Sequence, residues 1–421
     1  MTSDRRCFVY IFLPGEAEPI TAGTFAVTAR GGTSRGEFAY AREYLQRRDA
    51  VALDPVELRL GEQVHETTRM QGFFGAIRDA MPDDWGRRVL ERRKGLPQLE
   101  EFDYLMEGPD DRAGALGFGN VSSPPEYRPR FESLGSLERL QEVADAIARD
   151  EPVPAASDEE RFLSLLQAGT SMGGARPKVT IAHDGALWLA KFGFRDDVYA
   201  SPRVEHTLMN LARSCGLNVA ETRLESAGGR DVLLVRRFDR EKSGGDYSRC
   251  RMVSAMTVLQ AEGALTDRDR WSYLLLADEV RRSCAQPERD LVELFARMCF
   301  NAAISNLDDH PRNHALLAPA RDWHLSPAYD LTISPAISAE RRPLAMICGL
   351  QGRDANRSNL LSAAPRFFLG SDEAGKIFDR VAATVRSGWD EEMNRANVSR
   401  ETRQKIAESF LYPGLFYGDQ G

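Results

Sequence analysis

The segment 306–313 holds the residues whose types and spacing most clearly suggest chemistry. Asp308 stands five positions before Asn313, and Asp330 follows seventeen positions after Asn313. A kinase active site has this polar set, because one carboxylate orients the attacking hydroxyl group while other oxygen ligands hold Mg²⁺ on the nucleotide phosphates. We therefore assign Asp308 as the catalytic residue and expect Asn313 and Asp330 to bind Mg²⁺. Arg312 could contact the transferred phosphate, and we place His310 in the same nucleotide site.

A glycine-rich loop at 171–178 precedes a predicted β-hairpin and could approach the nucleotide phosphates. Gly173 and Gly174 allow the backbone to come close to an anion, and Ser171 and Ala175 flank them. The loop has neither the Walker A spacing nor a Gly-x-Gly-x-x-Gly pattern. An ordinary turn is therefore the competing interpretation of the glycine pair.

Lys191 lies near the end of an apolar strand predicted at 187–192. A lysine in such a strand is costly to bury unless its ammonium group meets an anion. In a kinase this lysine contacts the nucleotide phosphates and is held by a carboxylate from the following helix. Glu205, on a helix predicted at 202–215, is the best candidate for that carboxylate. A lysine that extends its ammonium group into solvent is the alternative.

The same region permits two other interpretations. Asp308, Asp309, His310 and His314 could ligate a transition metal that activates water, which would make the chain a hydrolase. Pro311 argues against a continuous helix through the two histidines, although a loop could still supply ligands. A polar turn that caps the preceding helix is the second alternative.

The predicted elements divide the chain at a proline-rich stretch, residues 150–158. Before it we expect strands and helices at 8–13, 20–28, 38–45, 72–94 and from Ser136 onward, with 38–45 either continuing the sheet or forming a short helix. After it we expect a helix at 159–167, a hairpin of 179–182 and 187–192, a helix at 202–215, a strand at 232–235, a helix at 288–305 and short strands at 314–317 and 323–325.

This order predicts an α+β, bilobal protein-kinase-like fold with an additional N-terminal domain. The N-terminal α+β domain would span 1–150 and the kinase-like domain 151–421. Within the latter, a β-rich ATP-binding lobe would span 151–245 and a helical catalytic lobe 246–421.

Composition narrows the class of protein further. Of the 421 residues, 55 are Lys or Arg and 63 are Asp or Glu, and the net charge of -8 argues against a surface that wraps nucleic acid throughout. The six cysteines form no Cys-x-x-Cys pair, so buried reduced thiols are expected. The apolar run 8–13 is too short for a signal peptide or a membrane span. We expect a cytoplasmic protein without membrane contact.

A basic stretch at 87–94 has two interpretations. A solvated helix face, with basic residues near the end of a helix that begins with acidic residues, is favoured. Contact with phosphate or with a partner is the sharper alternative.

Taken together, these segments resemble the HipA-like serine/threonine-protein kinases, the toxins of type II toxin–antitoxin systems. The resemblance covers nearly the whole chain, and its most specific segments are 237–240, 306–313 and 326–331. It implies ATP and Mg²⁺ as cofactors, Lys191 at the ATP phosphates, and a strand beside the adenine that includes Val235, Arg236 and Phe238.

The resemblance also implies regulation and partners. Ser171 would be autophosphorylated, which would add about two negative charges beside the nucleotide phosphates and repel them. The target would be an aminoacyl-tRNA synthetase or another translation-related protein. The partner would be a DNA-binding, HipB-like antitoxin, so contact with nucleic acid would be indirect. A non-catalytic module that binds a nucleotide or a partner remains an alternative.

Overall fold

The computed structural model describes residues 3–126, 131–152, 163, 166, 174–194, 197, 199–263, 265–335 and 338–417. The chain forms two compact units. The first unit comprises Met1–Arg195, Glu225–Thr257 and Leu317–Asp322, and the second comprises Asp196–Leu224, Val258–Leu316 and Trp323–Gly421. Both units contain helices as well as strands.

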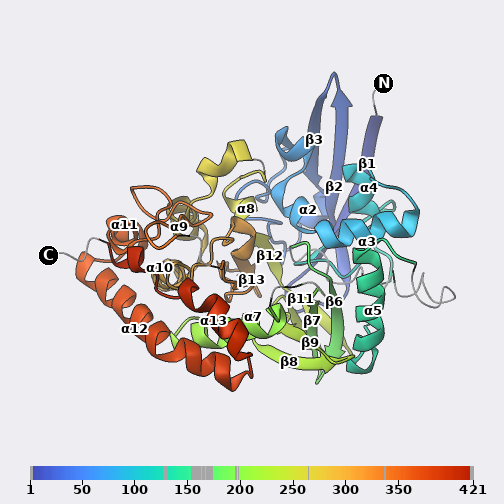
Figure 1. Ribbon diagram of the computed structural model, residues 1–421. Coiled ribbons are helices and arrows are strands. Elements are labelled where there is room, and N and C mark those ends of the chain that lie inside the picture. The colour runs from blue at the N-terminus through green and yellow to red at the C-terminus, as the bar shows by residue number, and fades with distance from the viewer. Residues whose placement is uncertain are drawn as a thin grey trace. The chain divides into compact units, whose positions relative to one another are not determined.

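A five-stranded sheet begins the first unit. Its order is β4-β3-β2-β1-β5, with β1 at Ser3–Phe12, β2 at Pro19–Arg30, β3 at Thr33–Tyr40, β4 at His65–Thr67 and β5 at Leu116–Gly119. The paired strands β1, β2 and β3 are drawn in blue in Figure 1. Phe25 and Phe38 are register partners, and both are buried on the core side of the sheet. The segment 38–45 forms both predicted structures in turn, because β3 ends at Tyr40 and helix α1 spans Arg42–Leu45.

The helical pattern predicted over 72–94 is divided in the structure. A 3-10 helix (η1, Arg69–Gly72) and helix α2 (Gly75–Asp79) come first, and helix α3 (Asp84–Lys94) starts anew after Pro82. Asp83 caps α3, because its Oδ1 accepts a hydrogen bond from the Gly86 N–H at 3.0 Å. Helix α4 (Glu101–Glu107), 3-10 helix η2 (Leu134–Ser136) and helix α5 (Leu137–Ala148) follow.

A four-stranded sheet forms the rest of the first unit's core. Its order is β6-β7-β9-β8, with β6 at Lys178–His183, β7 at Ala186–Phe192, β9 at Arg230–Arg236 and β8 at Thr222–Ala227. The predicted hairpin is confirmed as β6 and β7. One face of this sheet packs against α3 and α5 through Val179, Ile181, Trp188, Val232 and Leu234. Because side chains alternate along a strand, Lys178 and Lys191 belong to the other face. Short strands β10 (Arg240–Ser243), β11 (Asp246–Arg249) and β12 (Arg251–Ser254) continue the unit.

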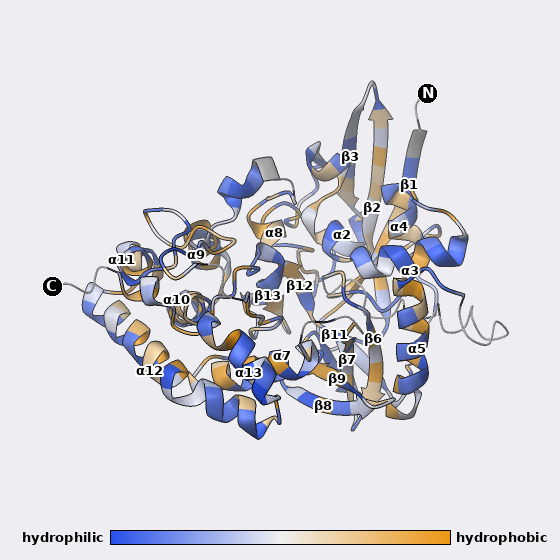
Figure 2. Cartoon of the chain, viewed as in Figure 1, coloured by the Kyte–Doolittle hydropathy of each residue, from blue (hydrophilic) through white to orange (hydrophobic). Residues whose placement is uncertain are grey.

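The second unit is mainly helical. Helix α10 (Pro287–Ala303), predicted at 288–305, lies at its centre and packs against α9 (Tyr273–Ser283) and α12 (Ser371–Arg395). Helix α7 (Ser201–Ser214), predicted at 202–215, also packs against α12. Figure 2 shows alternating blue and orange bands along α12, as expected for a helix with one buried face. The unit also contains η4 (Leu265–Arg270), η5 (Pro311–Asn313), β14 (His324–Leu325), α11 (Arg357–Ser362), η6 (Ala364–Phe367), α13 (Arg400–Ile406), η7 (Ala407–Ser409) and η8 (Pro413–Phe416). Helix α8 (Ala255–Val258) and strand β13 (Ala315–Ala318) each contain a point where the chain passes from one unit to the other.

Three further findings concern the expectations from sequence. All six cysteines are buried free thiols, as predicted. Within the described ranges, no helix combines the length and apolar character that crossing a bilayer requires. The helix predicted at 159–167 lies outside the described residues, apart from Leu163 and Leu166, which are buried in the core under the four-stranded sheet.

Candidate active site

The loop after α10 brings Asp308 and Asn313 together. The short helix η5 turns the chain back, and the side-chain amide of Asn313 donates to the backbone carbonyl of Asp308 at 3.3 Å. Asn313 is buried, whereas the side chain of Asp308 is exposed. The loop therefore presents one carboxylate to solvent and fixes a carboxamide beside its backbone.

Asp330 is held near this loop by its neighbours. The Tyr329 hydroxyl donates to the carbonyl of Arg312 at 2.7 Å. The backbone N–H of Ala328 donates to Asn218 at 2.8 Å, so the segment is also tied to the chain after α7. Asp330 itself adopts a left-handed conformation with φ of 58°, which is uncommon for a residue other than glycine. Such outliers are often found at functional sites.

The charge of Asp330 acts on Asp308, as the shifted pKa of Asp308 indicates. Desolvation by the surrounding protein raises the pKa of Asp308, and the negative charges of Asp330 and Asp309 raise it further, while His310 lowers it. A carboxylate that lies beside another negative charge favours a nearby cation, because the cation relieves the repulsion. The structure therefore brings together Asp308, Asn313 and Asp330, with Arg312 exposed beside them.

Five buried residues form hydrogen bonds beneath the loop that follows α10, and we call them the catalytic-loop network. It consists of Tyr273 on α9, Asn301 on α10, and Asn306, Asp309 and His314 of the loop region, each at most 1% exposed. The Tyr273 hydroxyl donates to Asp309 and accepts from the Asn301 amide at 3.0 Å. Asn306 donates to Asn301 at 3.1 Å, and the His314 Nε2 lies 3.1 Å from Asp309.

This network gives Asp309 a role different from that of Asp308. Burial alone would raise the pKa of Asp309, but the charge and hydrogen bond of His314 and the hydrogen bond from Tyr273 lower it. Burial and Asp309 together raise the pKa of Tyr273 well above its ordinary value. Asp309 is thus an ionised internal anchor, and Asp308 is the carboxylate that solvent can reach.

Reasoning from sequence missed Tyr273 and Asn301. Both are polar residues at inward positions of apolar helices, where a side chain without a partner would be costly. The polar residue in an apolar helix could have been noticed in the sequence. Its partners could not, because Asn301 and Asp309 lie 28 and 36 residues from Tyr273.

The metal-hydrolase interpretation finds no support in this arrangement. Asp309 and His314 are bonded to each other inside the catalytic-loop network. Over the ranges that the structure describes, no group of three or more His, Cys, Asp or Glu side chains is placed to hold a metal ion together. Asp309 and His314 therefore belong to the catalytic-loop network, whereas Asp308 faces solvent.

Most of the other residues predicted to bind the nucleotide lie in the first unit. Lys191 is half-buried on β7, opposite Leu233 of β9 and Lys178 of β6. Gly174 and Ala175 are exposed, and Gly174 has a φ of 101°, which favours glycine. The predicted residues Ser171 and Gly173 lie outside the described residues. Glu205, half-buried on α7, belongs to the second unit.

The strand predicted to lie beside adenine ends next to a buried charged cluster. Val235 is buried, Arg236 is exposed and Phe238 is half-buried. Beyond them, Arg237 and Arg240 bind Asp111 and Asp239, and we call these four residues the arginine–aspartate cluster. All four side chains are at most 4% exposed.

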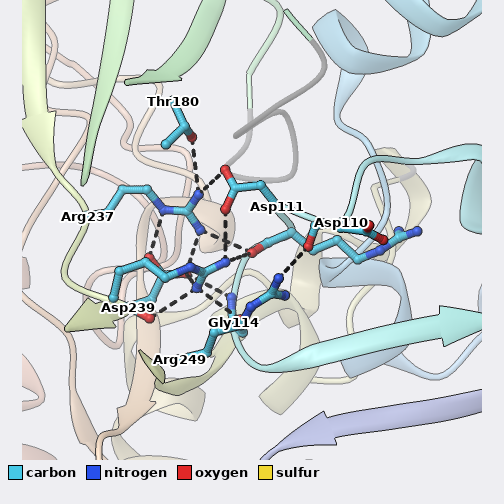
Figure 3. A network of polar contacts seen from close by, with 9 residues as sticks. Asp110, Asp111, Gly114, Thr180, Arg237, Asp239 and Arg249 are labelled. Atoms are coloured by element: carbon cyan, nitrogen blue, oxygen red, sulfur yellow. Dashed lines mark hydrogen bonds and ion pairs between the residues drawn. The ribbon is translucent and has the colours of Figure 1, made fainter. Parts of the chain in front are cut away.

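Figure 3 shows how this cluster connects distant segments. Arg237 donates from Nε and Nη2 to the two carboxylate oxygens of Asp239 at 3.0 and 2.9 Å, and from Nη1 to the Thr180 hydroxyl on β6 at 3.2 Å. Asp239 also accepts the Gly114 N–H at 2.9 Å. Burial would raise the pKa values of Asp111 and Asp239, but the charges of Arg237 and Arg240 lower both. The cluster therefore ties the loop after α4 to the end of β9.

The basic stretch at 87–94 makes contacts inside its own unit. Arg87 forms two hydrogen bonds of 2.7 Å with Glu101, and Lys94 pairs with Glu107 at 2.7 Å. Arg92 donates to the carbonyl of Glu151 at 2.8 Å. These contacts account for several of its charges without an external partner.

Two family models match the chain. The model of the HipA-like C-terminal domain matches residues 170–389, and that of the HipA N-terminal domain matches residues 18–119. Two Sinorhizobium fredii proteins, "Putative kinase Y4mE" and "Putative kinase Y4dM", are each 25% identical to this chain. The first match covers 74% of this chain and 75% of the relative, and the second covers 46% of each.

A solved structure shares the fold. A chain from the Shewanella oneidensis MR-1 toxin–antitoxin complex of HipA, HipB and operator DNA matches with a TM-score of 0.66 at 16% identity. The match covers 95% of this chain and 94% of that one. The predicted α+β kinase-like fold with an N-terminal domain is thereby confirmed.

Proposed function

The chain belongs to the HipA-like family, and we propose that it is an ATP-dependent serine/threonine-protein kinase. The observation that carries the proposal is the grouping of Asp308, Asn313 and Asp330 around one loop. The kinase names of the two Sinorhizobium fredii relatives support it.

The oxygen ligands of this group fit Mg²⁺. The negative charge of Asp330 raises the pKa of Asp308, and a divalent cation beside them would relieve that repulsion. Mg²⁺ prefers carboxylate and carbonyl oxygens together with substrate phosphates. In our assignment, Asn313 and Asp330 hold the ion, which when bound neutralises charge on the phosphates.

Asp308 then acts on the acceptor. It orients a serine or threonine hydroxyl group and accepts its proton, while the hydroxyl oxygen bonds to the γ-phosphorus and the bond to the bridging oxygen of ADP breaks. Arg312 is exposed beside the loop and contacts the transferred phosphoryl group in this assignment. His310, whose ring lies 6.4 Å from that of Trp271, lines the nucleotide side.

The first unit supplies the remaining ATP contacts in our proposal. Lys191 binds the phosphates, with Glu205 as its carboxylate partner. Gly173, Gly174 and Ala175 form the loop beside the phosphates, and Val235, Arg236 and Phe238 line the adenine. Backbone N–H groups in a glycine loop suit a phosphate, because no Cβ obstructs the approach.

Regulation and partners complete the proposal. We assign Ser171 as the site of autophosphorylation, a translation-related protein such as an aminoacyl-tRNA synthetase as target, and a HipB-like antitoxin as partner. The neighbouring HipA structure was solved with HipB and operator DNA, which supports the last assignment.

Quantitative phosphoproteomics after expression tests the proposal. Cells expressing the wild-type chain should gain phosphoserine or phosphothreonine on one or a few proteins and on Ser171. Cells expressing Asp308→Asn at the same level provide the background. Equal phosphorylation in the two cultures would refute kinase activity. In a Ser171→Ala variant, loss of phosphate from the chain itself, with the target proteins still phosphorylated, would identify Ser171 as the autophosphorylation site.

A further inference from the structure

Lys178, at the base of the glycine-rich loop, has a buried ammonium group. Its Nζ lies 2.7 Å from the Asp83 Oδ2 and donates to the carbonyl of Gly174 at 2.9 Å. The two side chains that form this ion pair are only 2% and 3% exposed. Lys178 therefore links the N-cap of α3 with the residue where the described part of the loop begins.

Asp83 is engaged on both of its carboxylate oxygens. Oδ1 accepts the Gly86 N–H, which fixes the side chain at the start of α3, and Oδ2 accepts from Lys178. Burial raises the pKa of Asp83, and the charge of Lys178 opposes that rise. Because a buried charge needs a partner, each member of the pair depends on the other to remain inside.

Gly174 depends on the same ammonium group. Its φ of 101° lies in a region that residues with a side chain rarely adopt. The Gly174 peptide group therefore has an orientation that is uncommon in other residues. A charge-assisted hydrogen bond from Lys178 to its carbonyl stabilises that orientation. The Asp83–Lys178 ion pair therefore helps to hold the backbone of the loop at Gly174.

The register of the hairpin adds an electrostatic consequence. Lys178 and Lys191 are direct partners on β6 and β7, so both side chains leave the same face of the sheet. Like charges directly opposite each other on two strands repel. Asp83 neutralises Lys178, and this lowers the repulsion that Lys191 experiences.

We propose that Asp83, acting through Lys178, is a positioning residue for ATP: it fixes the Gly174 end of the phosphate loop and neutralises Lys178 beside Lys191. The inference rests on the proposed kinase function and extends it to two residues outside the assigned site. Neither Asp83 nor Lys178 needs to touch the nucleotide for this role.

The test uses a double variant, because Asp83→Asn alone leaves a buried ammonium group without its carboxylate and could prevent folding. Asp83→Asn with Lys178→Met removes both charges, and asparagine still caps α3. Asp84→Asn is the matched control, since Asp84 is the adjacent, exposed carboxylate. Each full-length protein is measured by thermal melting, by amide hydrogen exchange without nucleotide, and by kinase kinetics.

The double variant should melt close to the wild-type temperature. Its amides at 174–178 should exchange roughly tenfold faster, and its KM for ATP should rise roughly tenfold with a smaller change in kcat, the loss expected for one charge-assisted hydrogen bond. The Asp84→Asn control should leave all three measurements unchanged.

Other outcomes overturn the proposal. Unchanged exchange at 174–178 in a folded double variant would show that the pair does not hold the loop. Faster exchange with an unchanged KM would show that the anchor has no influence on ATP. If the wild-type chain bound no ATP at all, the kinase proposal would fail, while the exchange experiment would still decide whether the anchor exists.

Discussion

The arginine–aspartate cluster of the first unit and the catalytic-loop network of the second unit are both buried, but they differ in charge. The cluster contains two arginines and two aspartates, and it joins segments that are more than 120 residues apart in sequence. The network contains one carboxylate, Asp309, surrounded by neutral hydrogen-bonding groups and one histidine. We conclude that the cluster mainly holds the first unit together, whereas the network mainly sets the geometry of one loop.

The largest effect should follow from breaking the charged cluster. Arg237→Met leaves Asp111 and Asp239 buried with less compensation, and we expect the free energy of unfolding to fall by about 3 to 5 kcal/mol. Urea unfolding followed by circular dichroism measures the change. Lys242→Met, at an exposed position of β10, is the control. A loss below about 1 kcal/mol in Arg237→Met would contradict the structural role of the cluster.

A smaller loss of stability and a larger loss of activity should follow from Tyr273→Phe. This change removes a hydroxyl that Asp309 and Asn301 share, at a cost of about 1 to 3 kcal/mol. Because Asp309 would lose one of the hydrogen bonds that hold it, kcat for phosphoryl transfer should fall while the KM for ATP changes little. Steady-state kinetics on the folded variant measures both. A fall in stability with kcat unchanged would assign the network to folding alone.

The cluster should also give the stability a characteristic pH dependence. Asp111 and Asp239 have lowered pKa values in the folded chain, so they contribute stability that is complete above the unfolded-state pKa of about 3.9. That contribution is lost as the pH falls through their folded pKa values. The free energy of unfolding should therefore drop below about pH 4, and less steeply in Arg237→Met. Parallel pH profiles for the two proteins would argue against this interpretation.

The smallest effect concerns the pH at which kcat falls on acidification, the acid limb of the pH profile. The pKa of Asp308 is raised, so kcat should begin to fall on acidification at a pH above the ordinary aspartate pKa of about 3.9. His310 lowers the pKa of Asp308, and His310→Gln should therefore move the acid limb to higher pH. The pH profile of kcat measures this shift. A shift toward lower pH would reverse the sign that we assign to His310.

The sequence was informative where function depends on local spacing. The interval from Asp308 to Asn313 and the strand pair before Asp330 predicted a turn that returns the second aspartate to the loop, and the structure brings these residues together. The hairpin of β6 and β7 and the helices α7 and α10 were predicted within a few residues, because hydrophobic periodicity is also local.

Contacts between distant segments were not predictable in the same way. Arg237 and Asp239 drew attention only as part of a family motif, and nothing in the sequence indicated Asp111 as the partner of Arg237, 126 residues earlier. Asp83 likewise looked like an ordinary helix start until its pairing with Lys178 was visible. Long-range ion pairs depend on how complete elements pack, and periodicity or spacing does not encode that.

Replacement of Asp308 is the most direct test of the account. Single-turnover transfer from γ-labelled ATP should be slower by about 10² to 10⁴-fold in Asp308→Asn, the contribution expected of a residue that accepts a proton in the reaction. The melting temperature of that variant should stay near the wild-type value, because the Asp308 side chain is exposed and the Asn313 amide bonds to its backbone carbonyl. Transfer within tenfold of the wild-type rate in a folded Asp308→Asn protein would contradict the assignment of the catalytic residue.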